Sequence, residues 1–308
     1  MGNIEDVVFA LGYNALGRPI MRSPGFRFVV LLIGLSAVAA HVLAQGKTSW
    51  ERNLVYFTDK HNVLRLDMAW PADVSEPLPA VIFLSTPASD ARSTYASQVE
   101  AAATRGYVGV TLDYHDIEIE DHGKARYPFP EQLLDVKRAI RWLKQNSEKY
   151  HIDPDQIGVI GWSYGGFLAL MAGLTGAGDG FEPPGDGPDT KVQAVISLAG
   201  FIDWAKMDES EASWSLGGTS QDMPDAYAKA SPLTYVRSDD PPVLLLYGKL
   251  DSVAPSEDAV TLDQKLADAG NQHSLYIINE ADHLQMSGYV DRGIVWSFFD
   301  GSLKHKNN

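Results

Sequence analysis

Short, continuous apolar runs recur along this chain, and they indicate strands that are buried on both faces of a sheet. Gly, Pro and Asp residues bound these runs, as is typical of strand ends. The runs cover residues 80–84, 107–112, 157–160, 192–198 and 243–247, and a last strand is predicted over 273–278. Helical spacing of apolar residues is found between them, over residues 95–105, 131–150, 256–270 and 289–303. Strands that alternate with helices predict a mainly parallel, twisted sheet with helices on both faces.

Other segments depart from this alternation. Residues 53–58 and 64–70 predict a hairpin ahead of the first buried strand. The helix predicted over 131–150 has apolar residues on one face, and its charges are expected on the other. Asp153, Pro154 and Asp155 predict a turn before the next strand. Residues 201–236 are irregular and aromatic, and they either form a small cap over a pocket or pack on the sheet as a helix pair.

The N-terminal residues predict an export signal. The apolar run of residues 28–40 follows Arg22 and Arg27, and residues 42–44 offer small side chains at the −3 and −1 positions of a cleavage site. The run is short for a membrane span. We therefore expect residues 1–44 to be a lead with a cleaved signal peptide, which implies a periplasmic or secreted protein. The alternative is a retained N-terminal anchor.

Composition narrows the possible partners. The chain of 308 residues is 45% hydrophobic and 21% charged, and we predict that residues 45–308 form one domain. A formal net charge of −15 repels nucleic acid and anionic lipid, so neither is an expected partner. The absence of cysteine excludes disulfides, thiolate metal sites and a Cys nucleophile. A separate hypothesis concerns the start of translation. A chain that begins at Met21 would have a signal peptide of more typical length.

One loop raises the question of a metal. Residues 113–130 are rich in His and carboxylate side chains, namely His115, Asp116, Glu118, Glu120, Asp121 and His122. Their spacing matches no common ligand pattern, so a solvated rim loop is the preferred interpretation. Nothing in the sequence calls for a metal or an organic cofactor.

The segment Gly161-Trp162-Ser163-Tyr164-Gly165 has the form of a nucleophile elbow. An apolar strand precedes it and an apolar helix follows it, which is the context that the Gly-x-Ser-x-Gly motif requires. Small residues flank the serine because the sharp turn leaves no space for a Cβ there. The backbone N–H of Tyr164 would face developing negative charge at the helix N-terminus. The simpler alternative is a glycine-rich turn in which Ser163 caps the helix.

Two further residues complete a nucleophilic constellation. A serine hydroxyl needs a base, and the base needs a carboxylate to orient it. Asp251 follows the buried strand 243–247, and His283 follows the last strand, in the chain order Ser, Asp, His. Other histidines lack that placement. Glu280 and Asp282 are competing carboxylates, but a neighbour in sequence rarely faces the Nδ1 of its own histidine.

These pieces resemble the esterase/lipase branch of the α/β-hydrolase superfamily. The resemblance is carried by residues 129–143, 152–161, 216–218 and 230–233, and it covers about residues 53–300. It implies an α/β-hydrolase fold with a small cap insertion at about 201–236. It also implies hydrolysis of carboxylic esters of small molecules through an acyl-enzyme. In that scheme Ser163 attacks, His283 acts as base and then acid, and Asp251 fixes its tautomer.

The oxyanion loop departs from that branch. Where His-Gly-Gly is usual, this chain has Ser85-Thr86-Pro87, and Pro87 has no N–H to donate. The second oxyanion donor is therefore expected to be Thr86, through its N–H or hydroxyl, or the N–H of Ala88. Tyr164 supplies the first donor.

The elbow also permits other functions. Gly-Trp-Ser-Tyr-Gly-Gly is typical of prolyl-oligopeptidase-type serine peptidases, so a peptidase acting on short peptides is the alternative enzyme. A catalytically silent binding protein is a third possibility. Trp162, Trp204 and Trp214 are the candidate substrate-binding residues, and they suggest an apolar or aromatic substrate group. The sequence leaves the oligomeric state open.

Overall fold

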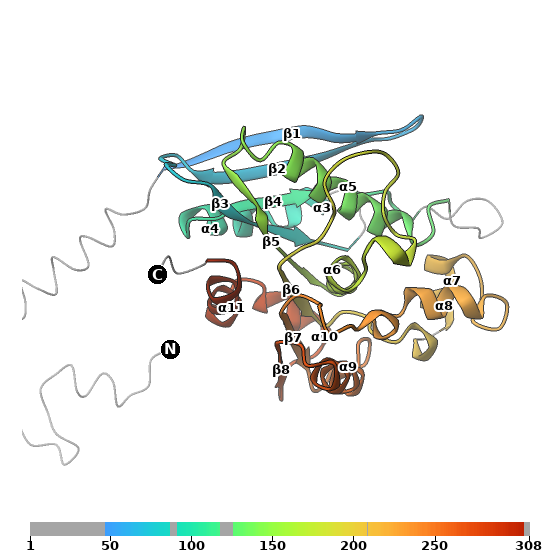
Figure 1. Cartoon of the computed structure of the whole chain (residues 1–308). Helices are drawn as coiled ribbons and strands as arrows, with labels where there is room; N and C mark the ends of the chain where they lie inside the picture. The colour runs from blue at the N-terminus through green and yellow to red at the C-terminus, as the bar shows by residue number, and fades with distance from the viewer. Residues whose placement is uncertain (1–46, 87–90, 118–125, 208, 305–308) are drawn as a thin grey trace, which may run out of the picture. The chain divides into compact units, whose positions relative to one another are not determined.

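An eight-stranded sheet in the order β1-β2-β4-β3-β5-β6-β7-β8 organises the molecule (Figure 1). The computed structural model describes residues 47–86, 91–117, 126–207 and 209–304. The strands are β1 (Thr48–Thr58), β2 (Val63–Pro71), β3 (Leu78–Leu84), β4 (Val108–Leu112), β5 (Ile152–Trp162), β6 (Ala194–Leu198), β7 (Val243–Gly248) and β8 (His273–Ile278). β1, β2 and β4 pair antiparallel, and all pairs from β4 to β8 are parallel. The predicted mainly parallel sheet is therefore confirmed.

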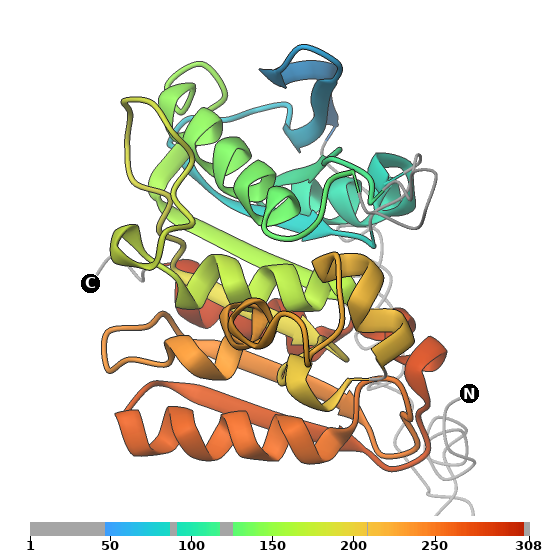
Figure 2. The same ribbon diagram turned by 90° about the vertical axis from the view of Figure 1, so that its right-hand side faces the viewer.

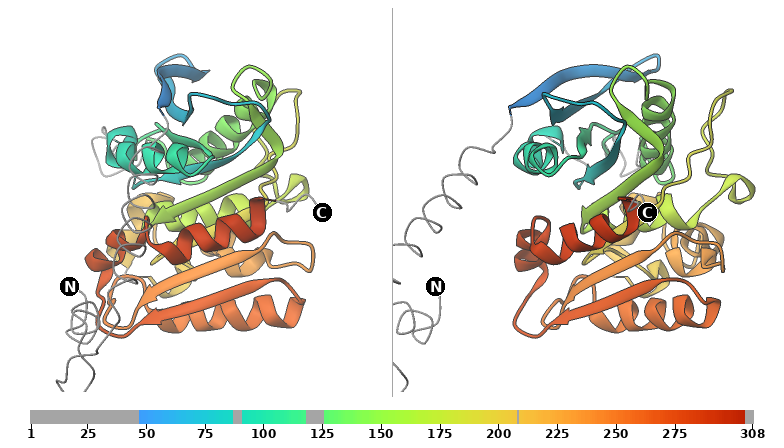
Figure 3. Two further views of the ribbon diagram at one scale, coloured as in Figure 1. Left: turned by 90° about the vertical axis from the view of Figure 1, so that its left-hand side faces the viewer. Right: turned by 60° about the vertical axis from the view of Figure 1, so that its left-hand side comes forward.

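Helices cover both faces of this sheet. Figure 2 shows α5 (Glu131–Gln145), α6 (Tyr164–Leu174) and α9 (Ser256–Ala269) in front of one face. Figure 3 shows α4 (Ala96–Thr104) and α11 (Gly293–Leu303) on the other. The short α3 (Ala91–Thr94) precedes α4. The central strands carry unbroken runs of buried residues, because helices lie above and below them.

The parallel strands bring distant loops to one edge. The carboxyl ends of β3, β5, β7 and β8 lead to Ser85, Ser163, Asp251 and His283 respectively. Neighbouring parallel strands end at the same edge of a sheet, so loops that are far apart in sequence converge there. The sheet thereby assembles the residues that the sequence singled out.

The segment between β6 and β7 folds into short helices. They are η2 (Trp204–Lys206), α7 (Glu209–Leu216), α8 (Pro224–Ala230) and η3 (Pro232–Tyr235). Trp204, Tyr227 and Tyr235 are buried within it, so the segment packs into the core as a helical insertion. Residues of the same segment also line the cavity described below.

Two local predictions are wrong. Residues 153–155 belong to β5 rather than to a turn, and the pairing of β5 with β3 shifts register there. That irregularity accommodates Pro154, which cannot donate to a regular ladder. The charges of α5 do not all face solvent either, since Asp135 and Lys137 are buried. The Lys137 ammonium is satisfied inside by Thr175, Glu182 and Thr190.

The predicted N-terminal signal lies outside the described residues. Among the helices of the described part of the chain, none has both the length and the hydropathy to cross a membrane. Residues 47–308 cluster as one compact unit. The last three elements of the described part of the chain are α10 (His283–Met286), η4 (Ser287–Tyr289) and α11.

Candidate active site

Ser163 has a backbone conformation that few non-glycine residues adopt, with φ 58° and ψ −124°. It stands between the end of β5 and the start of α6, and its N–H donates to the carbonyl of Leu198 at 2.9 Å. A Cβ on Gly161 would lie 2.3 Å from the carbonyl of Gly165. A Cβ on Gly165 would lie 2.0 Å from the carbonyl oxygen of Leu84. Strand, turn and helix thus approach so closely that only glycine fits on both sides of the serine.

The structure brings Ser163, His283 and Asp251 into one hydrogen-bonded line. Ser163 Oγ lies 2.9 Å from Nε2 of His283, and Nδ1 of His283 lies 2.8 Å from Oδ2 of Asp251. The other oxygen of Asp251 accepts from the backbone N–H groups of Val253 and Ala254. The Asp251 carboxylate is fully buried, while 14% of the His283 side chain is exposed. This arrangement can take a proton from the serine hydroxyl.

Asp282, one of the two competing carboxylates, does not face the imidazole of His283. Asp282 caps α10, where its side chain accepts from the N–H of Gln285 at 2.9 Å. Asp251 therefore faces the imidazole of His283 from a separate loop, as its place in the sequence predicts.

The structure describes two of the residues that were predicted to donate to the oxyanion, Tyr164 and Thr86. Tyr164 is the first residue of α6, so its N–H lies at the positive end of that helix, directly after the nucleophile. Thr86 lines the same cavity as Ser163 and Tyr164. The hydroxyl of the buried Tyr114 donates to the carbonyl of Ser85 and thereby fixes the start of this loop. Pro87 and Ala88 lie outside the described residues.

A cavity of about 290 Å³ opens at the nucleophile. Its walls are mostly apolar, and they comprise Thr86, Ser163, Tyr164, Phe201, Trp204, Met207, Ser215 and Val253. A second cavity of about 360 Å³ lies beside it and shares Phe201, Met207 and Val253. The second cavity is more polar, since Asp203, Lys206 and Asp258 also line it. Phe201 and Met207 of the insertion between β6 and β7 therefore line both adjoining cavities, together with Val253, which follows β7.

The three tryptophans predicted to bind substrate have different positions. Trp204 lines the catalytic cavity, although its own surface is fully buried. Trp162 instead supports the base: its Nε1 donates to the backbone carbonyl of His283 at 2.9 Å, and its ring lies 5.2 Å from the imidazole. Trp214 belongs to α7, and its side chain lies outside the described part of the structure.

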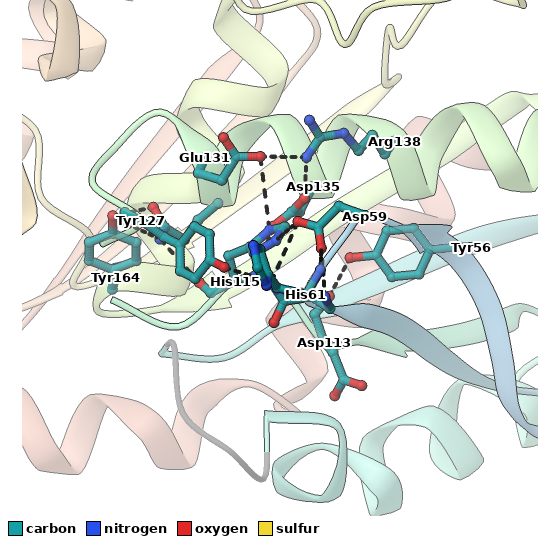
Figure 4. Close-up of polar contacts among 12 residues, drawn as sticks. Tyr56, Asp59, His61, Asp113, His115, Tyr127, Glu131, Asp135, Arg138 and Tyr164 are labelled. Carbon is teal, nitrogen blue, oxygen red and sulfur yellow. Dashed lines mark hydrogen bonds and ion pairs between the residues drawn. The ribbon is translucent and has the colours of Figure 1, made fainter. Parts of the chain in front are cut away.

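An ionic cluster around the buried His115 and Asp135 was not predicted from the sequence (Figure 4). His115, just after β4, contacts Asp59 of the β1–β2 turn and Asp135 of α5. Glu131 lies 3.9 Å from Nδ1 of His115. Arg138 bonds both Glu131 and Asp135. The available signal was the position of Asp135, three residues after Gln132 and four before Ala139, on the buried face of its helix.

This cluster bears on the question of a metal. His115, Glu131 and Asp135 have ligand atoms within 4.8 Å of one another, which is close enough to hold an ion. The guanidinium of Arg138 already supplies a positive charge to both carboxylates, and His115 bonds Asp135 directly at 2.7 Å. A metal would have to replace these bonds. Glu118, Glu120, Asp121 and His122 of the same loop lie outside the described residues.

The chain is similar in sequence to a protein family and to several named proteins. A model of the BD-FAE family matches residues 66–266. The probable carboxylic ester hydrolase LipM of Mycobacterium tuberculosis is 29% identical over 182 residues, which cover 56% of this chain and 41% of LipM. The uncharacterized peptidase YuxL of Bacillus subtilis is 26% identical over 234 residues, covering 68% of this chain and 32% of YuxL. The chain thus spans less than half the length of either relative.

Solved structures identify the fold. A truncated carbohydrate esterase from gut microbiota superposes with a TM-score of 0.68 at 24% identity, covering 84% of this chain and 94% of that one. The sheet order, the elbow and this likeness together establish the α/β-hydrolase fold that the sequence predicted.

Proposed function

The chain belongs to the BD-FAE family, and on that premise we propose that it hydrolyses carboxylic esters through an acyl-enzyme on Ser163. The observation that carries this proposal is the hydrogen-bonded line from Asp251 through His283 to Ser163, at 2.8 and 2.9 Å. A buried carboxylate, a partly exposed imidazole and a hydroxyl in a strained turn are the parts that acyl transfer needs.

The chemistry follows from these positions. Ser163 Oγ attacks the ester carbonyl carbon while Nε2 of His283 takes the hydroxyl proton. The carbonyl oxygen becomes an oxyanion that accepts a hydrogen bond from the N–H of Tyr164. The C–O bond to the alcohol then breaks, and the alcohol leaves with the proton from His283. Water next attacks the acyl-enzyme with His283 as base, which releases the carboxylic acid and restores Ser163.

Thr86 is proposed as the second oxyanion donor. It shares the cavity with Ser163, and the preceding Ser85 is held by Tyr114. Removing one donor from such a site typically lowers kcat about 10²–10³-fold. Thr86→Ala would remove the hydroxyl but keep the N–H, so a large fall in kcat would identify the hydroxyl as the donor and an unchanged kcat would favour a backbone N–H.

The cavity indicates the substrate class. A space of about 290 Å³ with Phe201, Trp204 and Met207 in its wall suits a short aliphatic or an aromatic acyl group. The adjoining cavity with Asp203, Lys206 and Asp258 offers a polar environment for the other half of the ester.

A peptidase is the second candidate, because the elbow and the likeness to a peptidase-named relative both favour it. The test is turnover of p-nitrophenyl esters, from acetate to decanoate, beside peptide p-nitroanilides with the full chain. We expect ester turnover with a short-chain optimum and far slower anilide cleavage. Faster anilide cleavage would favour the peptidase, and absence of both reactions from folded protein would favour a binding protein.

Export stays a prediction from residues 1–44. We propose that the working enzyme lacks them, and the N-terminal sequence of protein recovered from the producing cell tests this. A mature protein that begins at Gln45 is expected, and a chain that retains residues 28–40 in the membrane fraction would contradict it.

A further inference from the structure

His115 has a carboxylate at each ring nitrogen (Figure 4). Its Nδ1 lies 2.7 Å from Oδ2 of Asp135, and its Nε2 lies 3.0 Å from Oδ2 of Asp59. The same oxygen of Asp135 accepts from the backbone N–H of His115 at 2.8 Å. The side chains of His115 and Asp135 are 1% and 0% exposed, so solvent does not supply alternative partners.

This geometry fixes the charge of the ring. An ionised carboxylate only accepts hydrogen bonds, whereas a neutral imidazole has one nitrogen without a proton. Backbone hydrogen bonds from His61 and Asn62, with the bond to His115, hold the pKa of Asp59 well below its ordinary value. The second oxygen of Asp135 accepts from Arg138. Each nitrogen of His115 is therefore placed to donate to a carboxylate oxygen, which an imidazolium can do at both positions and a neutral ring at only one.

The surroundings support this charge. The titratable and charged groups around the ring come from five segments. They are Asp59 of the β1–β2 turn, Tyr127 of the segment before α5, Glu131, Asp135 and Arg138 of α5, Tyr56 of β1, and Asp113, whose carbonyl accepts from Tyr56 just after β4. Burial alone lowers the pKa of His115, but the bonds to Asp135 and Asp59 and the charge of Glu131 outweigh it and raise the pKa above its ordinary value.

A second set of hydrogen bonds connects His115 through Gln132 with Tyr164, the residue after the nucleophile. Gln132 is fully buried in the first turn of α5. Its Nε2 donates to the carbonyls of His115 and Tyr127 at 3.1 and 2.8 Å. Its Oε1 accepts from the hydroxyl of Tyr164 at 3.4 Å. Tyr164 lines the catalytic cavity and directly follows the nucleophile, so the cluster and the site share one buried network.

We propose that His115 is a positioning residue whose imidazolium clamps the β1–β2 turn and the loop after β4 onto α5, and that Gln132 transmits this clamp to Tyr164. The ordered Tyr164 keeps its N–H and its ring where the oxyanion and the substrate are expected. The kinetic part of this inference rests on the proposed ester hydrolysis, while its structural part does not.

The stability that this clamp gives to the fold should decrease as the pH rises. Because the folded pKa of His115 is raised, the clamp stabilises the fold fully below the ordinary histidine pKa of about 6.5. The stabilisation is lost as pH rises through the folded pKa. Deprotonation would leave one nitrogen facing a carboxylate oxygen without a hydrogen between them, so the turn or the loop would release.

The first test needs no activity. In ¹⁵N-resolved NMR spectra of the full chain, we expect the His115 ring to carry two protons at neutral pH and to titrate above the ordinary histidine range. The Tyr164 amide should shift with the same midpoint, and Gln132→Met should uncouple the two while leaving the ring titration in place. A neutral His115 ring at pH 7 would overturn the proposal. So would a Tyr164 amide whose chemical shift does not change as His115 titrates.

The second test is kinetic. His115→Gln should lower kcat for an ester substrate about ten- to a hundredfold at temperatures where the variant is folded, since a small misplacement of reacting groups costs that much. His115→Arg, which keeps a permanent charge and several donors, should restore much of kcat. It should also abolish the fall in kcat that we expect of the wild type as the pH rises through the pKa of His115. His273→Gln is the matched control, because His273 faces Asp263 at 3.5 Å at the other end of the sheet.

The outcomes separate the two proposals. If His115→Gln only lowers the melting temperature and leaves kcat and its pH profile unchanged, the positioning role is wrong. If the wild type hydrolyses no ester but Tyr164 still follows the His115 titration, the proposed function fails and the clamp stands.

Discussion

The indole Nε1 of Trp162 donates to the backbone carbonyl of His283 at 2.9 Å, so the residue before the nucleophile holds the loop that carries the base. The two rings also pack with centroids 5.2 Å apart. The last residue of β5 therefore sets the distance between Ser163 and His283. Trp162 acts on the catalytic line itself, and its ring is not part of the described wall of the catalytic cavity.

Trp162→Phe should lower kcat for ester hydrolysis about tenfold with little change in KM. Phenylalanine keeps an aromatic ring against the imidazole but cannot donate to the His283 carbonyl. A hydrogen bond of this kind contributes up to about 1.5 kcal/mol, and tenfold in rate corresponds to about 1.4 kcal/mol. Steady-state kinetics on one short-chain ester measure it. A raised KM with unchanged kcat would instead place Trp162 in the substrate site.

Asp251→Asn should lower kcat about 10⁴-fold while the protein stays folded. The amide can still accept from Val253 and Ala254, but its NH₂ would face Nδ1 of His283 and force the proton onto Nε2. That tautomer cannot take the proton of Ser163. Asp282→Asn is the matched control, since asparagine also caps α10, and near-normal kcat is expected there.

Gly165→Ala should destabilise the fold by about 1–3 kcal/mol and abolish most activity. The new Cβ would stand 2.0 Å from the carbonyl oxygen of Leu84, so β3 and α6 would have to separate. Chemical denaturation and ester turnover report the two effects. Gly178→Ala is the control, because nothing lies within 4 Å of its added Cβ. Equal stability of the two variants would contradict the close packing of the elbow.

Met207→Ala should move the acyl-chain preference toward longer esters. Met207 stands in the wall shared by the catalytic cavity and its polar neighbour, so truncation joins the two spaces. The ratio of kcat/KM for octanoate over acetate should rise about tenfold. Met223→Ala, at an exposed position away from both cavities, should leave the ratio unchanged. An unchanged ratio in Met207→Ala would show that the acyl chain runs elsewhere.

The parallel sheet and the catalytic line could be predicted from sequence because their signals are local. A buried strand reads as an unbroken apolar run, as in residues 243–247, and Asp251 follows directly. Gly161 and Gly165 mark the turn because the backbone crowding there excludes any Cβ. His283 was then predicted from the order Ser, Asp, His along the chain. In the structure its Nε2 lies 2.9 Å from Ser163 Oγ.

The remaining features depend on contacts between distant segments. Asp135 and Lys137 are charged residues that a sequence pattern places on the solvent face of a helix. Inside the fold, however, His115 and Glu182 from other segments pair with them. Pro154 signals a turn locally, yet a register shift against β3 lets β5 continue through it. His115 looks like one of several loop histidines, because its role is set by Asp59, 56 residues earlier, and Asp135, 20 residues later.

The most direct test of the account is a rapid-mixing burst experiment with p-nitrophenyl acetate on the wild type and Ser163→Ala, followed by intact-mass and peptide-mass analysis. For the wild type we expect a burst of one nitrophenolate per chain and a transient acetyl group on Ser163. For Ser163→Ala we expect neither, with kcat lowered by at least about 10⁴-fold. Undiminished turnover in folded Ser163→Ala, or acetyl on another residue, would contradict Ser163 as the nucleophile.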